Sequence, residues 1–167
     1  MRKLLIDLNA CDAAIKWAEG KSWQEIFDTC HRGDWLLWLH FRTNKDDLQI
    51  RTLAKGHCAN TVRHLMKDKR SIAAVDMAIS YGNGFATLAE LKYAADAAYA
   101  AAAYAYAAAA YVVDATADAA YVAYVASVAY VADATAAKTQ NQLQTADIVR
   151  QYIPIEKWNI DLNLKWE

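Results

Sequence analysis

Hydrophobic and polar positions follow helical spacing over most of the chain. Between residues 94 and 137 roughly half of the positions are alanine, none is glycine or proline, and a tyrosine or an aspartate recurs every few residues. Alanine is the best helix former and is too small to cover a pleated face, so this stretch predicts helices with closely approaching axes. The pattern therefore predicts an all-α protein, a compact multi-helix bundle with long alanine-rich antiparallel helices.

Two short helices are expected near the beginning of the chain. Asn9 fits an N-cap and Gly20 a C′ residue, which predicts a helix between them. The spacing of Ser22 and Glu25 is that of a capping box, which predicts a second helix that runs through residue 30.

Three further helices precede the alanine-rich region. The segment 35–41 has almost no polar side, which predicts a helix buried all round. Apolar residues at alternating steps of three and four predict the next helix over 46–66, and a fifth is expected over 71–80.

The alanine-rich region is too long for one straight helix. It opens with a second capping box at 87–90. An unbroken helix over 87–152 would approach roughly 100 Å, far more than a domain of this size spans. We therefore expect a corner, at 112–116 or, as the second choice, at 134–140. The last helix should stop at Pro154, because proline cannot continue it.

The two ends of the chain show strand-like alternation. Apolar residues alternate with polar ones over 4–8 and again over 158–166, and the tetrapeptide Ile-Asp-Leu-Asn occurs at 6–9 and at 160–163. A period of two is typical of a strand. The termini are expected to form either a short two-stranded β-ribbon or, at the C-terminus, an unstructured tail.

One helical domain over 1–167 is expected. With 56% hydrophobic residues the chain is long enough to bury a single core. Within it, short helices that contain tryptophan, histidine and cysteine occupy 8–86, long Ala/Tyr-rich helices occupy 87–153, and an extended tail occupies 154–167.

Charge and cysteine usage narrow the function classes. A formal net charge of −1 lacks the basic footprint of proteins that bind nucleic acid or anionic membranes, so neither partner is expected. No stretch reaches about 20 strongly apolar residues, as a membrane span requires. Cys11, Cys30 and Cys58 are odd in number and lie among apolar neighbours, which predicts buried free thiols in a reducing cytoplasm.

Candidate catalytic chemistry is sparse. Neither Cys-x-x-Cys nor His-x-x-x-His occurs, so no metal and no cofactor is expected. His57 and Cys58 lie on an apolar stripe and are interpreted as core residues. Cys30 or Cys58 could be paired with His31 or His40 as nucleophile and base, but nothing in the sequence orients a third group. We therefore predict a protein that is not an enzyme.

The turn before the tryptophan-rich helix carries an Arg-x-Asp sequence. Asp34 fits an N-cap, with Arg32 closing the corner through a hydrogen-bonded ion pair. A contact of these two residues with a partner is the alternative. Trp35 and Trp38 follow in the helix and are expected to be core residues.

Tyrosine and aspartate recur along the alanine-rich region. Tyr93, Tyr104 and Tyr111 are separated by eleven and seven residues, and eighteen residues make five helical turns, so all three share one face. Tyrosine is enriched at interfaces because it combines large area with a hydrogen-bonding tip. The tyrosines either fill gaps between alanine faces or contact a partner. The candidate partner-binding residues are Tyr99, Tyr104, Tyr111, Asp114, Asp118 and Tyr121.

Several segments together resemble one known family. Residues 11–17, the Arg-x-Asp-Trp-x-x-Trp pattern within 32–39, the tyrosine-punctuated alanine repeats, and the Ala-Asp-Ile-Val-Arg sequence with its proline within 145–154 resemble the Imm-5-like immunity proteins. That family also occurs in phage and prophage genomes, and the likeness spans about residues 8–154. The chain departs from the family where a cysteine and a more basic stretch are usual, because it has Gln140, Gln142 and Gln144 there.

The resemblance implies a protein that neutralises a partner protein by binding it. We expect a cytoplasmic, stoichiometric inhibitor of a bacterial toxin, as an immunity protein would be, or of a host defence effector, as a phage anti-defence or anti-CRISPR protein would be. The alternative is a structural or assembly protein that oligomerises through its alanine-rich helices. Whether the chain forms a homodimer stays open.

Overall fold

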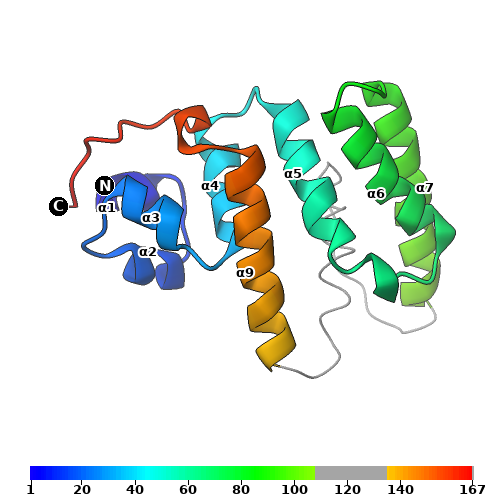
Figure 1. The fold of residues 1–167 in the computed structure, drawn as a ribbon, viewed down its shortest axis with the longest axis horizontal. Coiled ribbons are helices and arrows are strands. Elements are labelled where there is room, and N and C mark those ends of the chain that lie inside the picture. The colour runs from blue at the N-terminus through cyan, green and yellow to red at the C-terminus, as the bar shows by residue number, and fades with distance from the viewer. Residues whose placement is uncertain (108–134, 167) are drawn as a thin grey trace.

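The computed structural model describes residues 1–107 and 135–166, with side chains described for 1–100 and 139–166 (Figure 1). This part of the chain contains α-helices and two short 3-10 turns and no strand, which confirms the predicted all-α class. The elements in chain order are α1 (Arg2–Asp7), α2 (Asp12–Ala18), α3 (Trp23–Thr29), α4 (Gly33–Thr43), α5 (Leu48–Asn60), η1 (Arg63–Leu65), α6 (Lys69–Gly82), α7 (Leu88–Ala107), α9 (Thr135–Tyr152) and η3 (Ile155–Lys157).

The longer helices lie side by side in an order that differs from the chain order. α9 packs against both α4 and α5, α5 packs against α6, and α6 packs against α7. The short helices α1, α2 and α3 gather at the opposite end from α6 and α7, and the chain after η3 runs back to α1 (Figure 1). The amino group of Met1 donates a hydrogen bond to the carbonyl of Lys165 at 2.7 Å, so residues from both ends of the chain meet.

A large core joins the short helices to α4, α5 and α9. Its most deeply buried side chains include Trp23, Leu36, Val149 and Ile153. Trp158, which follows η3, is buried in the same cluster and packs edge-on against the ring of Phe27, with 5.3 Å between ring centroids. Residues from the first and last thirds of the chain therefore share one core.

The tryptophans of α4 are less buried than expected. Trp35 and Trp38 are half-buried at the margin of the large core, and Phe41 in the same helix is 46% exposed. The prediction of a helix buried all round is therefore wrong, because α9 and α5 leave one side of α4 facing solvent. Phe41 on that side is partly covered by the guanidinium of Arg51, 5.1 Å from its ring centroid.

A thin core of small side chains joins α5, α6 and α7. Its buried members are mainly alanines, together with Val75 and Leu91. The helices approach closely, since a Cβ atom on Gly82 would lie 2.6 Å from the Cα of Leu53. Only glycine leaves room for the neighbouring backbone at this crossing.

The N-terminal segment is a helix and not part of a ribbon. Arg2–Asp7 forms α1, which buries Leu5 and lays Leu4 and Leu8 against the large core. Apolar residues at 4, 5 and 8 also fit helical spacing, and burial on one face outweighs the period-2 pattern. The tail over 158–166 is irregular but is anchored by the buried Trp158, so the described residues form no terminal β-ribbon.

The predicted helix signals were mostly correct. Both predicted capping boxes, 22–25 and 87–90, are formed. In each, the hydroxyl of the serine or threonine accepts a hydrogen bond from the backbone N–H of the glutamate, and the glutamate carboxylate accepts one from the backbone N–H of that serine or threonine. Gly20 has φ +75° just after α2. The N-cap of α2 is Cys11, however, because Asn9 adopts φ +62° and lies in the turn between α1 and α2.

The largest difference in a helix boundary is at the end of α5, whereas α4 and α6 each extend two residues beyond both predicted ends. The helix predicted over 46–66 ends at Asn60, and η1 follows after Thr61, whose hydroxyl donates to the carbonyl of Cys58 at 2.8 Å. α9 ends at Tyr152, two residues before Pro154, as predicted. The proposed corner at 112–116 lies outside the described residues. The second choice, 134–140, is wrong, because residues 135–140 belong to α9.

Among the described residues, no helix combines the length and apolarity that crossing a bilayer demands.

Candidate functional site

The predicted partner-binding residues fall mostly beyond the described part of the chain. Tyr99 lies in α7 and is 45% exposed. The backbone of Tyr104 belongs to the same helix. The other four, Tyr111, Asp114, Asp118 and Tyr121, lie outside the described residues.

The outward side of α7 and the turn before it form a candidate interface, which we call the α7 face; its residues are Phe85, Leu88, Lys92, Tyr93, Asp96 and Tyr99. Leu91, Ala94 and Ala98 point the opposite way and are buried against α6 and its neighbours. Phe85 in the turn is 84% exposed and Tyr93 is 80% exposed. Two large aromatic side chains therefore stand almost fully in solvent on this side of the molecule.

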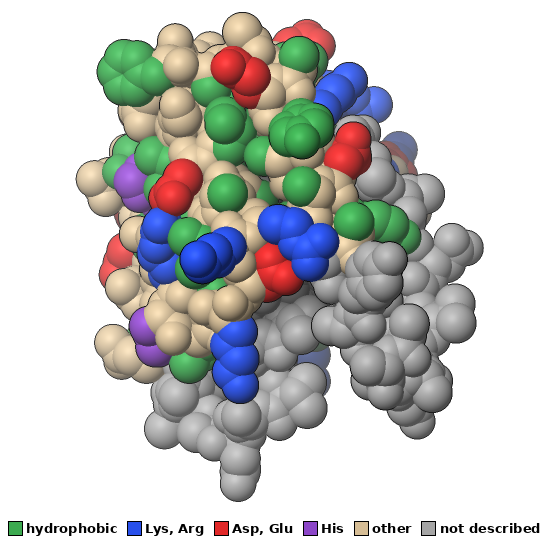
Figure 2. All heavy atoms as spheres, turned by 90° about the vertical axis from the view of Figure 1, so that its right-hand side faces the viewer, with side chains coloured by type: hydrophobic (Ala, Val, Ile, Leu, Met, Phe, Trp, Pro, Cys, Tyr) green, Lys and Arg blue, Asp and Glu red, His purple; other side chains and the backbone are tan. Residues whose placement is uncertain are grey.

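The α7 face carries one positive and one negative side chain, Lys92 and Asp96, and both could form ion pairs with a partner. Neither Lys92 nor Asp96 forms an ion pair with another described residue. The nearby Glu90 is used by the capping box, where the backbone N–H and the hydroxyl of Thr87 lower the pKa of its carboxyl. On the side that carries α6 and α7, hydrophobic side chains stand among basic and acidic ones (Figure 2). A surface on which apolar and charged side chains lie together is typical of protein interfaces, which have an apolar centre and a polar rim.

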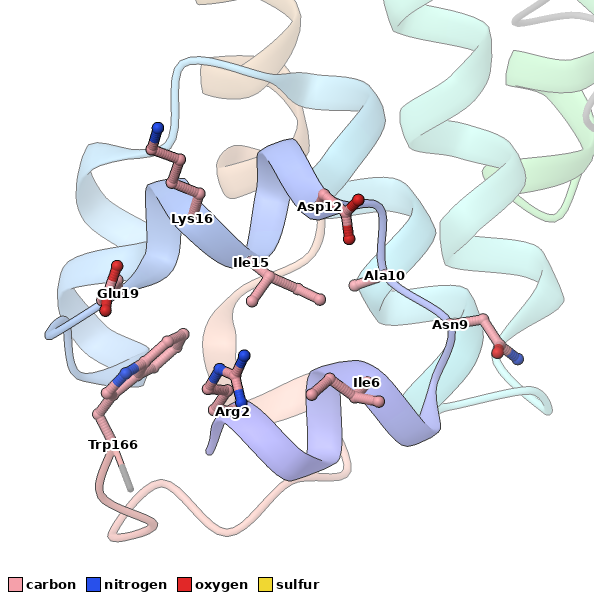
Figure 3. Close-up of a pocket in the computed structure, with 9 residues that line it drawn as sticks. All are labelled: Arg2, Ile6, Asn9, Ala10, Asp12, Ile15, Lys16, Glu19 and Trp166. Atoms are coloured by element: carbon pink, nitrogen blue, oxygen red, sulfur yellow. The ribbon is translucent and has the colours of Figure 1, made fainter.

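A second candidate is a cleft at the opposite end of the molecule, between α1, α2 and the C-terminal tail (Figure 3). Its volume of about 660 Å³ lies within the range of small-ligand sites. Its apolar surface comes from Ile6, Ala10, Ile15 and the indole of Trp166. Its polar lining consists of Arg2, Asn9, Asp12, Lys16 and Glu19.

The charged groups of this cleft have no partner in the described part of the chain. Neither cation, Arg2 or Lys16, and neither carboxylate, Asp12 or Glu19, forms a side-chain hydrogen bond or an ion pair there. Sequence reasoning missed this site, because residues 2 and 166 are far apart in the chain and only the fold brings them together. The only hint of this cleft in the sequence was the presence of charged residues on α1 and α2, two short helices that follow each other in the chain.

The cysteine–histidine pairs considered as catalytic groups are not assembled. Cys30 and Cys58 are buried, as predicted, and their thiols donate to backbone carbonyls. Burial raises the pKa of Cys58 to about 12 and also raises that of Cys30, so both remain protonated at neutral pH. Cys11 is exposed, which contradicts the prediction that all three thiols are buried, because its position as N-cap of α2 turns it outward.

Three of the four histidines pack against neighbouring side chains. His57, predicted to be a core residue, is half-buried, and its ring stacks on Tyr152 with 4.4 Å between ring centroids. His31 packs edge-on against Trp17 at 6.0 Å. His40 is fully buried, and neither of its ring nitrogens has a hydrogen-bond partner among the described residues. No group of three metal-ligating side chains converges within the described ranges.

His40 lies beside a buried arginine that holds the turn between α4 and α5. The guanidinium of Arg51 donates to the carbonyls of Asn44 at 2.8 Å and Lys45 at 3.2 Å. Desolvation, followed by the charge of Arg51, lowers the pKa of His40 to about 4, although Asp47 lies 3.9 Å away and opposes the shift. His40 is therefore neutral at pH 7.

The Arg-x-Asp turn forms the expected ion pair. Arg32 Nε donates to Asp34 at 2.7 Å, and the guanidinium also lies over the ring of Trp35. The N-cap position belongs to Arg32 and not to Asp34, which falls within the first turn of α4. Whether this pair also contacts a partner stays a prediction.

Comparisons of the chain with models of protein families, with curated proteins and with solved structures each find no match.

Proposed function

We propose that this protein binds a partner protein stoichiometrically through the α7 face and inhibits it by occlusion. The observation that carries the proposal is the exposure of Phe85 and Tyr93, at 84% and 80%. Binding energy at protein interfaces concentrates in a few large side chains, aromatic ones above all, so these two are the first candidates for anchors.

The geometry favours a helix-in-groove contact. α7 packs against its neighbours through Leu91, Ala94 and Ala98, which leaves the opposite side of the helix facing outward. A helix held rigidly from behind presents its outward side chains with little ordering cost on binding. The complementary partner surface is an apolar groove with charges at its rim, to meet Lys92 and Asp96.

The kind of partner follows from the resemblance to Imm-5-like proteins and belongs to the proposal. A bacterial toxin or a host defence effector would be blocked by steric cover of its working surface. Inhibition by steric cover requires no catalytic group on the inhibitor. It requires a stable surface that is complementary to the partner.

The partner can be found and the surface tested in one experiment. A photo-crosslinking amino acid placed at Tyr93 should capture a specific protein in the native host, whereas the same amino acid at the exposed Leu143 of α9 should not. With the captured protein purified, inhibition should saturate near one equivalent of this protein.

Variants then separate binding from stability. Phe85→Ala combined with Tyr93→Ala should weaken binding at least about 30-fold, as expected for the loss of one or two anchors of roughly 2 kcal/mol. The matched control, Leu143→Ala combined with Leu162→Ala, removes two exposed apolar side chains elsewhere and should leave affinity unchanged. Equal affinity for both double variants, or full inhibition at a hundredfold lower dose, would contradict the proposal. Capture of a second copy of this chain at position 93 would favour the assembly alternative.

A further inference from the structure

One corner of the molecule encloses an imidazole that has no hydrogen-bond partner. His40 lies in the last part of α4, its side chain is fully buried, and neither ring nitrogen has a partner among the described residues. The turn over 44–47 follows it and leads into α5, and η3 lies beside that turn at the top of the view (Figure 1). Three elements therefore meet around one ionisable group.

The charges around His40 do not suit its protonated form. Asp47, the N-cap of α5, has its carboxylate 3.9 Å from Nε2, which is beyond hydrogen-bonding distance. The charges of Arg51 in α5 and Lys157 in η3 oppose protonation, and Asp47 favours it. An imidazolium has two N–H donors, and the closed corner offers neither of them a hydrogen-bond partner among the described residues.

α9 also packs against α4, but its described charged side chains are engaged elsewhere. These are Asp147 and Arg150, which form an ion pair at 2.8 Å. The guanidinium of Arg150 donates to the carbonyls of Phe27 and Cys30, at 2.9 Å each, so the pair lies at the turn after α3. The charge balance at His40 is therefore set by α5 and η3.

A small set of hydrogen bonds closes the corner. The guanidinium of Arg51 donates to the carbonyls of Asn44 and Lys45, at 2.8 and 3.2 Å. The side-chain amide of Asn44 donates to the carbonyl of Lys157 at 2.8 Å, which ties the turn to η3. α4 and α5 are otherwise joined mainly through α9, which packs against both. Breaking the bonds of the turn therefore leaves the main helix contacts in place.

We propose that protonation of His40 opens this corner locally, so that the 44–47 turn separates from η3 and water reaches the imidazolium while the other helices stay packed. Water supplies the two acceptors that the closed corner lacks. A buried charge without partners is costly, and opening one turn relieves that cost with the loss of few contacts. The inference does not depend on the proposed partner, because the α7 face lies beyond α6.

Amide hydrogen exchange of the whole protein measures the opening. Burial, followed by the charge of Arg51, holds the pKa of His40 at about 4, below its ordinary value near 6.5. The open corner takes up the proton first on acidification, so its population should rise about 20-fold between pH 7 and 5. After correction for intrinsic exchange rates, the backbone N–H groups of Asn44 and Lys157, which donate to carbonyls at this corner, should lose protection by that factor.

Exchange in urea at pH 5 separates local opening from unfolding. A local opening exposes little surface, so exchange at Asn44 and Lys157 should stay nearly constant up to about 1 M urea. Exchange at Val75 of α6 and Ala94 of α7, both buried, should accelerate more steeply, because it requires a larger part of the protein to open.

Three variants assign the proton to His40. His40→Leu should abolish the pH-dependent loss of protection at the corner, whereas the matched control His64→Leu, which removes an exposed imidazole of η1, should retain it. Asn44→Ala keeps His40 but removes the side-chain bond to Lys157. It should lower protection at Lys157 at pH 7 and still show the further loss of about 20-fold at pH 5. This variant keeps the test valid even if His40→Leu loosens the corner at both pH values.

Three results would overturn the proposal. The first is unchanged protection at Asn44 and Lys157 between pH 7 and 5. The second is an equal urea dependence at these two positions and at Val75 and Ala94, since the corner would then open only when the protein unfolds. The third is a loss of protection on acidification that is the same in His40→Leu as in the parent.

Discussion

The two halves of the helix row are held together by different means. Around α4 and α9, large side chains such as Trp23, Ile153 and Trp158 fill a wide space between helices. Between α5, α6 and α7 the buried residues are mostly alanine, and Gly82 brings the helix backbones close. The packing of the first region depends on large side chains that fill the space between helices. The packing of the second depends on small residues that let the helices approach closely.

This difference predicts opposite sensitivities to mutation. Removing atoms should damage the wide core, because a cavity is left in a space that its neighbours only partly refill. Adding atoms should damage the thin core, because close-packed backbones must move apart. Each of the following experiments tests one side of that contrast.

The largest effect is expected for Trp23→Ala. Trp23 is fully buried, so its truncation should lower the free energy of unfolding by about 3–5 kcal/mol. Trp35→Ala, which truncates a half-buried ring at the core margin, should cost about 1–2 kcal/mol. Urea unfolding followed by circular dichroism measures both. Equal costs would show that the margin of this core is as tightly packed as its centre.

A smaller loss is expected for Gly82→Ala in the thin core. The new Cβ would lie 2.6 Å from the Cα of Leu53, so α5 and α6 must separate, at about 2–3 kcal/mol. Gly56→Ala brings its Cβ to 2.8 Å from Cγ1 and 3.1 Å from the backbone N of Ile79, a less severe approach to the neighbouring backbone, so it should cost less. A rise in melting temperature for Gly82→Ala would mean that the crossing has room to spare.

The smallest effect is a dependence on pH in the wide core. His40 has a folded-state pKa of about 4, below its ordinary value near 6.5, so the unfolded chain takes up the proton first on acidification. Stability is therefore fully present above pH 6.5 and falls as pH drops toward 4, by about 1–2 kcal/mol between pH 7 and 5.

His40→Leu is the matched variant for this titration. It removes the imidazole, whose nitrogens have no hydrogen-bond partner in the described chain, so little should be lost at pH 7. Unfolding curves at pH 7 and 5 should show a smaller drop for the variant than for the parent. Parallel pH profiles would place the acid sensitivity in other groups.

The sequence predicted what depends on neighbours in the chain. Helix class, the capping boxes at 22–25 and 87–90, and the stop before Pro154 all follow from local backbone chemistry, and all are confirmed. The secondary structure of the N-terminal segment could not be predicted from local sequence, because Leu4 and Leu8 fit both a strand and a helix. Contact with the large core decided it.

Burial and the candidate sites were harder to predict. The segment 35–41 has almost no polar side, so its pattern predicts deep burial of Trp35. In the fold Trp23 is central and Trp35 is marginal, because burial depends on how the helices pack together. The cleft combines residue 2 with residue 166 and has no sequence motif. The exposure of Phe85 and Tyr93 likewise depends on which side of α7 meets α6.

The position of α9 between α4 and α5 sets an order for folding during synthesis. Ala146 and Val149 of α9 complete a core whose earlier members end at Cys58. On the order of 90 residues must emerge in the interval, which takes about 5–20 s at usual translation rates. During that time the sides of α4 and α5 that α9 will cover remain exposed to solvent. We therefore expect the nascent chain to need chaperones that cover apolar surface until α9 has been made.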